Sequence, residues 1–298
     1  MILVPTLSSH LFALSALDEE ILSAVADAGF RSIELFAAPQ HLPLHDLRST
    51  ERVVRAVDEK GMKIAAFHAP FYMSLEELIA GKTYALGDRD PDRRARALAS
   101  TKDLLSLAAA FGSADLVVHM GHHDAATADA GLFVDSLNRL LGEVKSFTGQ
   151  LLLENTPHVA ESFEELEAVC DASPAGRLGF CIDLGHLHIH CAPDRACGMA
   201  KDDAAQRALF DRILGRTRHF HVHDNGGVKD EHLPPGEGTI DWGAVLKRLD
   251  AAAGEATFSL ELRDLSRGRL RPREYLASVL DRISGPVRDR FKDGGIRL

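Results

Sequence analysis

Short apolar runs alternate with amphipathic stretches along the whole chain. Each run is almost continuously apolar or β-branched, which is typical of strands covered on both faces in a parallel sheet. In the stretches between the runs, apolar residues recur at the spacing of a helix that packs by one face. The predicted strands span residues 2–5, 32–36, 63–67, 115–119, 151–154, 178–183, 218–223 and 257–262, and the predicted helices span residues 18–28, 49–60, 91–111, 127–147, 162–171, 203–214, 241–253 and 272–284.

This alternation predicts an α/β fold. Eight strand–helix units in 298 residues predict a single (β/α)8 TIM barrel. No linker, charge block or internal repeat divides the chain, so residues 1–298 are expected to form one barrel domain. An open doubly wound sheet is the alternative, but such sheets usually carry a glycine-rich loop after the first strand, and residues 5–10 contain no glycine. Glycines that suit a left-handed helix end precede predicted strands at Gly29, Gly61, Gly112 and Gly254.

Charge and composition limit the kinds of molecule that the protein is expected to bind. A formal net charge of −10 at pH 7 disfavours nucleic acid, because phosphate binding needs a basic surface. The first residues lack the basic start and cleavage site of a signal peptide, and no apolar stretch is long enough to cross a membrane. We therefore expect a cytoplasmic protein without a membrane partner. The cysteines show no CxxC spacing and are expected to be reduced thiols in the core or in loops: Cys170, Cys181, Cys191 and Cys197.

Candidate chemistry stands at the carboxyl ends of the predicted strands, where β/α barrels build their active sites. The third to eighth strands each end in His, Glu or Asp. Carboxylates in an apolar barrel need a positive partner, and imidazole nitrogens together with carboxylate oxygens are ligands for zinc, manganese, cobalt or iron. The residues at these ends are His68, His119, Glu154, Asp183 with His186, His221 and Glu261.

A second candidate pair, Asp230 and His232, follows the seventh predicted strand in a loop rich in glycine and proline. A loop with a fixed backbone can aim two ligands at a metal ion, although such a charged pair is equally compatible with a solvated turn.

These motifs resemble a known superfamily, that of xylose isomerase-like sugar isomerases and epimerases and of endonuclease IV-type apurinic-site nucleases. Its sugar branch implies one divalent metal held by Glu154, Asp183, His221 and Glu261, with the two glutamates working as acid and base. Its nuclease branch implies three metals, with further ligands at His68, His119, His186, Asp230 and His232. The resemblance is carried by the segments 153–156, 182–186 and 221–242. We accordingly predict one to three ions, zinc or manganese, and the catalytic residues Glu154, Glu261 and His186.

The substrate loops favour the sugar branch. Residues 37–45 contain no basic residue, whereas the nucleases place arginines there. The next loop offers Tyr72, which matches a nuclease aromatic in type, followed by arginines interleaved with aspartates. We therefore predict an isomerase or epimerase that moves a proton beside the carbonyl of a keto sugar or related polyol, through an enediolate. The alternatives are an apurinic-site nuclease and a non-catalytic metal-binding barrel. The sequence does not indicate an oligomeric state.

The predicted substrate contacts are His10, Tyr72 and Arg263. Solvation is the simpler expectation for loop histidines, including His41 and His45. His223 is expected to pack behind the barrel wall or on the loop, and Trp242 to anchor a helix start. An extra metal cluster at His188, His190 and Cys191 is disfavoured, whereas outer-shell roles remain open for His122, His123 and His158.

Overall fold

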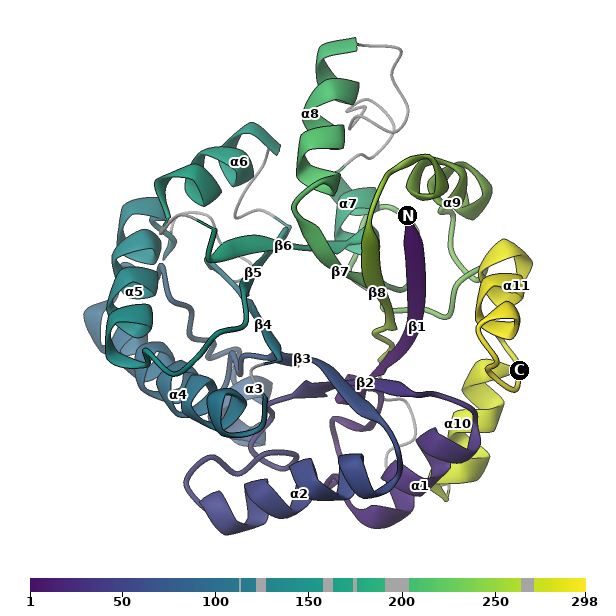
Figure 1. The fold of residues 1–298 in the computed structure, drawn as a ribbon, viewed down its shortest axis with the longest axis horizontal. Coiled ribbons are helices and arrows are strands. Elements are labelled where there is room, and N and C mark those ends of the chain that lie inside the picture. The colour runs from purple at the N-terminus through teal and green to yellow at the C-terminus, as the bar shows by residue number, and fades with distance from the viewer. Residues whose placement is uncertain (113, 122–126, 158–162, 174–175, 191–203, 264–270) are drawn as a thin grey trace.

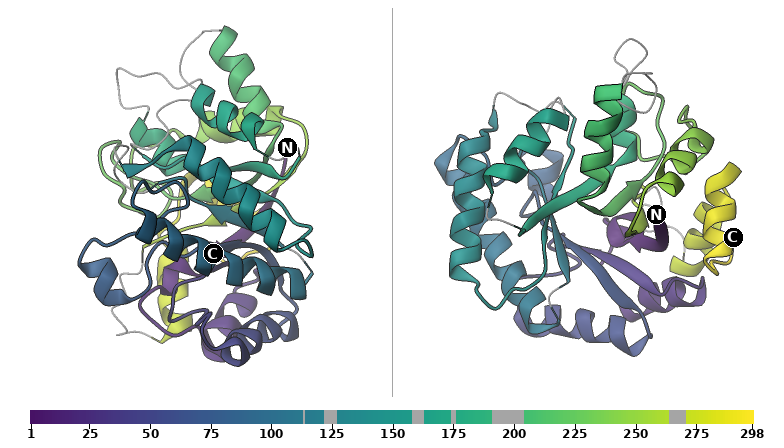
Figure 2. Two further views of the ribbon diagram at one scale, coloured as in Figure 1. Left: turned by 90° about the vertical axis from the view of Figure 1, so that its left-hand side faces the viewer. Right: turned by 45° about the horizontal axis from the view of Figure 1, so that its top comes forward.

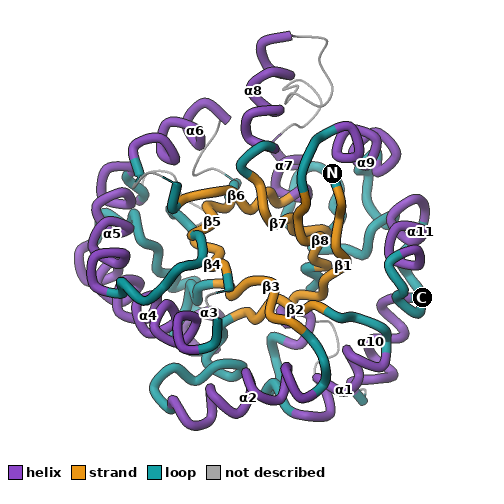
Figure 3. The backbone as a smooth tube through the Cα atoms, viewed as in Figure 1, coloured by secondary structure: helices purple, strands orange, loops and turns teal. Residues whose placement is uncertain are grey.

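Eight parallel strands close into a barrel in the computed structural model, each hydrogen-bonded to its neighbours in chain order, with β8 returning to β1. Figures 1 and 3 show this ring of strands inside a ring of helices. The structure describes residues 1–112, 114–121, 127–157, 163–173, 176–190, 204–263 and 271–298. The strands are β1 (Ile2–Ser8), β2 (Ser32–Phe36), β3 (Lys63–His68), β4 (Asp115–Val118), β5 (Leu151–Glu154), β6 (Leu178–Asp183), β7 (Thr217–Val222) and β8 (Glu255–Leu260).

All eight predicted helices have a counterpart in the helical layer, which confirms the predicted (β/α)8 class. Periodicity did not predict the short elements η1, α3 and α7 or the terminal α11. Figure 2 shows the helices from the side, with α8 standing out at one edge. The helices are η1 (Ser9–Phe12), α1 (Glu19–Asp27), α2 (Leu47–Glu59), α3 (Leu75–Ile79), α4 (Pro91–Ala110), α5 (Ala130–Glu143), α6 (Phe163–Ala172), α7 (Leu184–His190), α8 (Ala204–Leu214), α9 (Trp242–Ala251), α10 (Pro272–Leu280) and α11 (Gly285–Asp293).

Helix α1 illustrates how the sequence sets these elements. The Asp18 side chain caps the helix by accepting a hydrogen bond from the Ile21 amide at 2.9 Å. Ile21 and Val25, four residues apart, are buried on one face. The chain turns just after the helix at Gly29, whose φ of 104° is costly for any residue with a Cβ. Positive φ angles at Gly61, Gly112 and Gly254 confirm the other predicted turns.

The barrel interior contains an apolar cluster and a cluster of buried polar residues. The small apolar cluster consists of Ala66, Val117, Leu152 and Cys181. A polar cluster of Glu34, His219, His221 and Ser259 is also buried, and Cys181 adjoins its two histidines. Cys170 and Cys181 are buried free thiols, as expected, whereas Cys191 and Cys197 lie outside the described residues. Among the described residues, no helix has the length and apolar character that crossing a bilayer requires.

Candidate metal centre

Glu154 is the centre of the site, because imidazoles from three other parts of the barrel approach its carboxylate. Oε2 lies 3.2 Å from His68 Nε2 and 2.9 Å from His119 Nε2. Oε1 lies 3.2 Å from His186 Nδ1. All of these side chains are at least nine-tenths buried. We call His68, His119 and Glu154 the first ligand group.

His221 faces three carboxylates with one ring nitrogen. Its Nδ1 lies 3.2 Å from Glu261 Oε2, 3.4 Å from Glu154 Oε2 and 3.6 Å from Asp183 Oδ2. This buried nitrogen has no hydrogen-bond partner among the described atoms. One imidazole nitrogen and three carboxylates form a donor set that suits a divalent cation, and the four residues are the second ligand group.

The third ligand group surrounds Asp230 and includes His186, His232 and His223. Asp230 Oδ2 lies 3.0 Å from His232 Nε2 and 3.4 Å from His186 Nε2. The Nδ1 atoms of these two rings lie 2.7 Å from the Glu261 carbonyl oxygen and 3.0 Å from the Asn155 carbonyl oxygen, respectively. Each Nδ1–H can therefore donate to a carbonyl, which leaves the Nε2 lone pair free to bind a metal.

Backbone strain also marks this group. His232 has a φ of 48°, and it is the non-glycine residue with a positive φ in the part of the chain that the structure describes. Such a conformation costs free energy and persists where the surrounding structure enforces it, often at functional sites. The ring of this strained residue lies beside Asp230, with Nε2 3.0 Å from Oδ2.

Asp224 holds the loop that carries Asp230 and His232. Its buried carboxylate accepts hydrogen bonds from the Gly236 amide at 2.8 Å and from Trp242 Nε1 at 2.9 Å. It also accepts from the amides of Asn225 and Ile240. Trp242 is thus an anchor at the start of α9, as the sequence predicted.

The carboxylates and imidazoles of the ligand groups shift one another's pKa values. Burial lowers the pKa of His232, but the neighbouring carboxylates, Asp230 first and then Glu261 and Asp183, together outweigh burial and raise that pKa to about 9. Burial raises the pKa of Asp230, yet His232 and His186 hold it below its usual range. Burial also raises the pKa of Glu154, and the nearby imidazoles, His119 first, bring it well below the normal value.

These shifts predict how the metal-free protein responds to pH. The fold favours protonated His232, so its contribution to the free energy of unfolding is full below pH 6.5 and is lost as pH rises through about 9. A metal ligand must be a neutral imidazole, so divalent-metal affinity should rise over the same window. Denaturant unfolding of chelated protein and calorimetric titration with zinc, both across this range, check the two trends. A flat profile in both would contradict the assignment of His232.

A pocket of about 700 Å³ opens over the ligand groups. It is lined by the first-group residues, by Glu261, by three members of the third group, and by all three predicted substrate contacts, His10, Tyr72 and Arg263. The third-group members are His186, Asp230 and His232. His10 faces this pocket, and burial lowers its pKa to about 4, so it is neutral at pH 7. Tyr72 is 1% exposed and lies next to Phe36 and Phe71, so it forms part of the wall.

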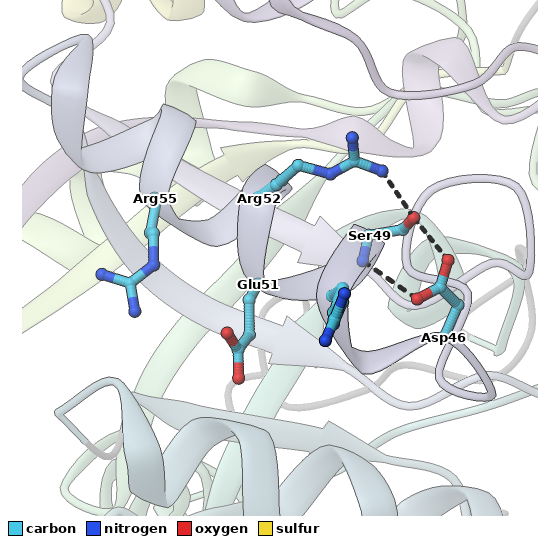
Figure 4. Close-up of a pocket in the computed structure, with 6 residues that line it drawn as sticks. Asp46, Ser49, Glu51, Arg52 and Arg55 are labelled. Atoms are coloured by element: carbon cyan, nitrogen blue, oxygen red, sulfur yellow. Dashed lines mark hydrogen bonds between the residues drawn. The ribbon is translucent and has the colours of Figure 1, made fainter.

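A second hollow, on the outer surface along α2, lacks this kind of chemistry. Figure 4 shows its lining, in which Asp46 caps the helix by accepting hydrogen bonds from the Ser49 amide and hydroxyl. Arg52 extends toward Ser49, whereas Arg55 points away from it, and no histidine lines the hollow. The first pocket is therefore the candidate site.

Two residues that sequence reasoning misplaced or missed belong to the centre. His223 does not pack behind the barrel wall: it is the first residue after β7, at the start of the loop, and its Nε2 lies 3.1 Å from Asp183. Residues two apart in extended chain share a face, so His223 lies on the same side as His221. Glu34 was missed, although an acidic residue within an apolar strand was a signal. Its Oε1 lies 2.9 Å from His221 Nε2.

The other histidines have mixed outcomes. His45 is exposed, as expected. His41 is not solvated: it is buried, with Nε2 2.9 Å from the Phe12 carbonyl oxygen. His188 bonds to the Thr239 hydroxyl at 2.8 Å. His122, His123, His158 and Cys191 lie outside the described residues.

The fold and these motifs place the chain in a family. A family model described as xylose isomerase-like TIM barrel matches residues 22–282, and the chain belongs to this family. The resemblance inferred from the strand-end motifs is thereby confirmed.

Two relatives found by sequence are both described as probable endonucleases. The chain is 27% identical over 250 residues to a probable endonuclease 4 of Trichlorobacter lovleyi, covering 78% of this chain and 84% of that protein. It is 31% identical over 160 residues to a probable endonuclease 4 of a Geobacter species, covering 49% and 55% of the two chains.

Among solved structures, a putative xylose isomerase from Rhodospirillum rubrum superposes with a TM-score of 0.72 at 16% identity, covering 95% of this chain and all of that one. A D-tagatose 3-epimerase-like protein gives 0.68 at 20% identity, covering 97% and 100%. The IOLI protein, whose structure contains a zinc atom, gives 0.69 at 15% identity, covering 98% of each chain. These likenesses show a shared fold.

Proposed function

We propose that the protein is a divalent-metal-dependent isomerase or epimerase of a small keto sugar or related polyol. The observation that carries this proposal is the placement of two buried carboxylates, Glu154 and Glu261, beside the same atom, His221 Nδ1, in the wall of one pocket. Two carboxylates at one point can remove and return a proton on a substrate held between them.

The residues have distinct roles in this reaction. A bound zinc or manganese ion supplies Lewis-acid polarisation of the substrate carbonyl and its neighbouring hydroxyl. Glu154 or Glu261 takes the proton from the carbon next to the carbonyl, and the other carboxylate returns it. Arg263, exposed at the rim, is placed to bind an outer oxygen or anionic group of the substrate. Neutral His10 offers a further hydrogen bond.

The shape of the pocket supports a small substrate. Its volume lies in the range of small-molecule sites. Residues 37 and 38, at the start of the loop that would need to reach a DNA groove, are buried, and the loop carries no basic residue. Tyr72 is packed in the wall and accepts a hydrogen bond from Gln40, so it does not project as a wedge. The net charge of −10 also opposes binding to a duplex.

Phosphodiester hydrolysis is the second candidate. The first and third ligand groups favour it, since several metals around one carboxylate are typical of enzymes that cleave phosphodiesters. The endonuclease 4 relatives point the same way.

Proton exchange distinguishes the two candidates. Zinc- or manganese-loaded protein, incubated in deuterated water with a panel of free and phosphorylated ketoses, should place deuterium on the carbon next to a carbonyl. Chelated protein is the control. Metal-dependent incision of a duplex with an abasic site, without exchange on any ketose, would replace this proposal with the nuclease one.

A further inference from the structure

We propose that His223 completes a closed, four-ligand metal site with His186, Asp230 and His232, and that its ion is structural. All three imidazole Nε2 atoms lie near the Asp230 carboxylate: His232 at 3.0 Å, His186 at 3.4 Å and His223 at 3.7 Å. One ligand atom from each of the four side chains lies within 4.8 Å of the others. Three imidazoles and one carboxylate form a set that zinc accepts in tetrahedral geometry.

The chain makes room for His223 in this position. Its ring is fully buried and stacks on His232, with centroids 3.9 Å apart and planes 22° from parallel. A Cβ at position 185 would overlap the His223 ring, so Gly185 permits the close approach. The Nδ1 of His223 is buried without a hydrogen-bond partner among the described atoms.

The fourth ligand changes what the ion can do. Zinc sites with four protein ligands are closed and structural, whereas catalytic sites keep one position open for water or substrate. His186, Asp230 and His232 line the pocket, whereas His223 is fully buried and does not. The ion would fasten the 224–240 loop to the ends of β6 and β7. This inference depends on the proposed function in one respect: it takes the second ligand group as the reactive centre.

His223 Nε2 also lies 3.1 Å from Asp183, so a role confined to orienting Asp183 is the competing explanation. The two roles predict that replacing His223 weakens the binding of different ions. As an orienting residue, His223 would affect the ion of the second group, to which Asp183 belongs. As a ligand, it would affect the ion of the third group.

Zinc release from the full chain tests the inference without any substrate. Wild-type protein loaded with zinc should retain one ion that exchanges slowly with a chromogenic chelator. His223→Gln should release that ion at least about tenfold faster, and Gly185→Ala, which displaces the ring but keeps the imidazole, should do the same. His219→Gln, which removes another buried histidine of the barrel interior, is the matched control and should retain it.

A double variant separates the ions. Asp183→Asn should lose a different ion, so Asp183→Asn with His223→Gln should lose both. Release from His223→Gln at the wild-type rate, or a double variant that loses no more zinc than Asp183→Asn alone, would overturn the proposal. Failure of the isomerase assignment would leave these release rates unchanged, so the two outcomes are distinguishable.

Discussion

Replacing Glu154 with Gln should reduce turnover by about 10²- to 10⁴-fold, the range for loss of a general acid or base. The same change should remove the ions of the first and second ligand groups, because Oε2 of this carboxylate lies 2.9 Å from His119 and 3.4 Å from His221. The third group keeps its own carboxylate, Asp230, and should keep its ion. Elemental analysis beside the exchange assay measures both effects.

Glu34→Gln is the matched control for that variant. It removes the charge of an equally buried carboxylate, but Glu34 contacts the opposite ring nitrogen of His221. An amide oxygen can still accept the His221 Nε2–H, so metal affinity should fall by about 10- to 100-fold, as for other groups that orient a ligand. At saturating metal the control should retain its ions. Retention of these ions by Glu154→Gln at the level of the control would mean that Glu154 is not a ligand.

Asp224→Ala should have the largest effect on stability. Four donors surround this fully buried carboxylate, among them the Trp242 indole and the Gly236 amide. Each buried donor left unpaired costs about 1 to 3 kcal/mol, so we expect a loss of about 3 to 5 kcal/mol in the free energy of unfolding. The loop should loosen, and the third group should lose its ion.

Denaturant unfolding of zinc-loaded and chelated protein tests this expectation. The loss in Asp224→Ala should exceed that in Asp224→Asn, which keeps one acceptor oxygen. The loss in the free energy of unfolding should also be larger with zinc than without, because zinc stabilises the wild type but cannot bind the third ligand group of the variant. A change below about 1 kcal/mol would show that the loop is held by other contacts.

The barrel and the convergence of most candidate ligands could be predicted from the sequence because both follow short-range rules. Strand periodicity places Glu154 and Asp183 at the ends of β5 and β6, and parallel strands bring those ends to one edge of the barrel. His223 was expected behind the barrel wall or on the loop; it is the first residue after β7, and its ring is buried beside Asp183 on the face it shares with His221. The role of Glu34 depends on a partner 187 residues away, which local patterns do not reveal.

The pocket walls were harder to predict. Tyr72 was expected to contact the substrate and does line the pocket, but its burial against Phe36 follows from how two loops pack. Helix α7, which carries His186, begins directly after β6, and a seven-residue element is too short for periodicity to show. Long-range packing therefore determines which residues form the pocket walls, whereas sequence spacing determines which residues stand at the strand ends.

Metal content tests the central claim most directly, namely that the strand-end residues hold divalent ions. Purified protein should be saturated with zinc, freed of excess metal and analysed for zinc per chain, with melting temperature measured before and after chelation. We predict at least two ions per chain in the wild type, a drop in melting temperature on chelation, and recovery on adding zinc back. A chain that binds no zinc or manganese after reconstitution, with a melting temperature that chelation leaves unchanged, would contradict the account.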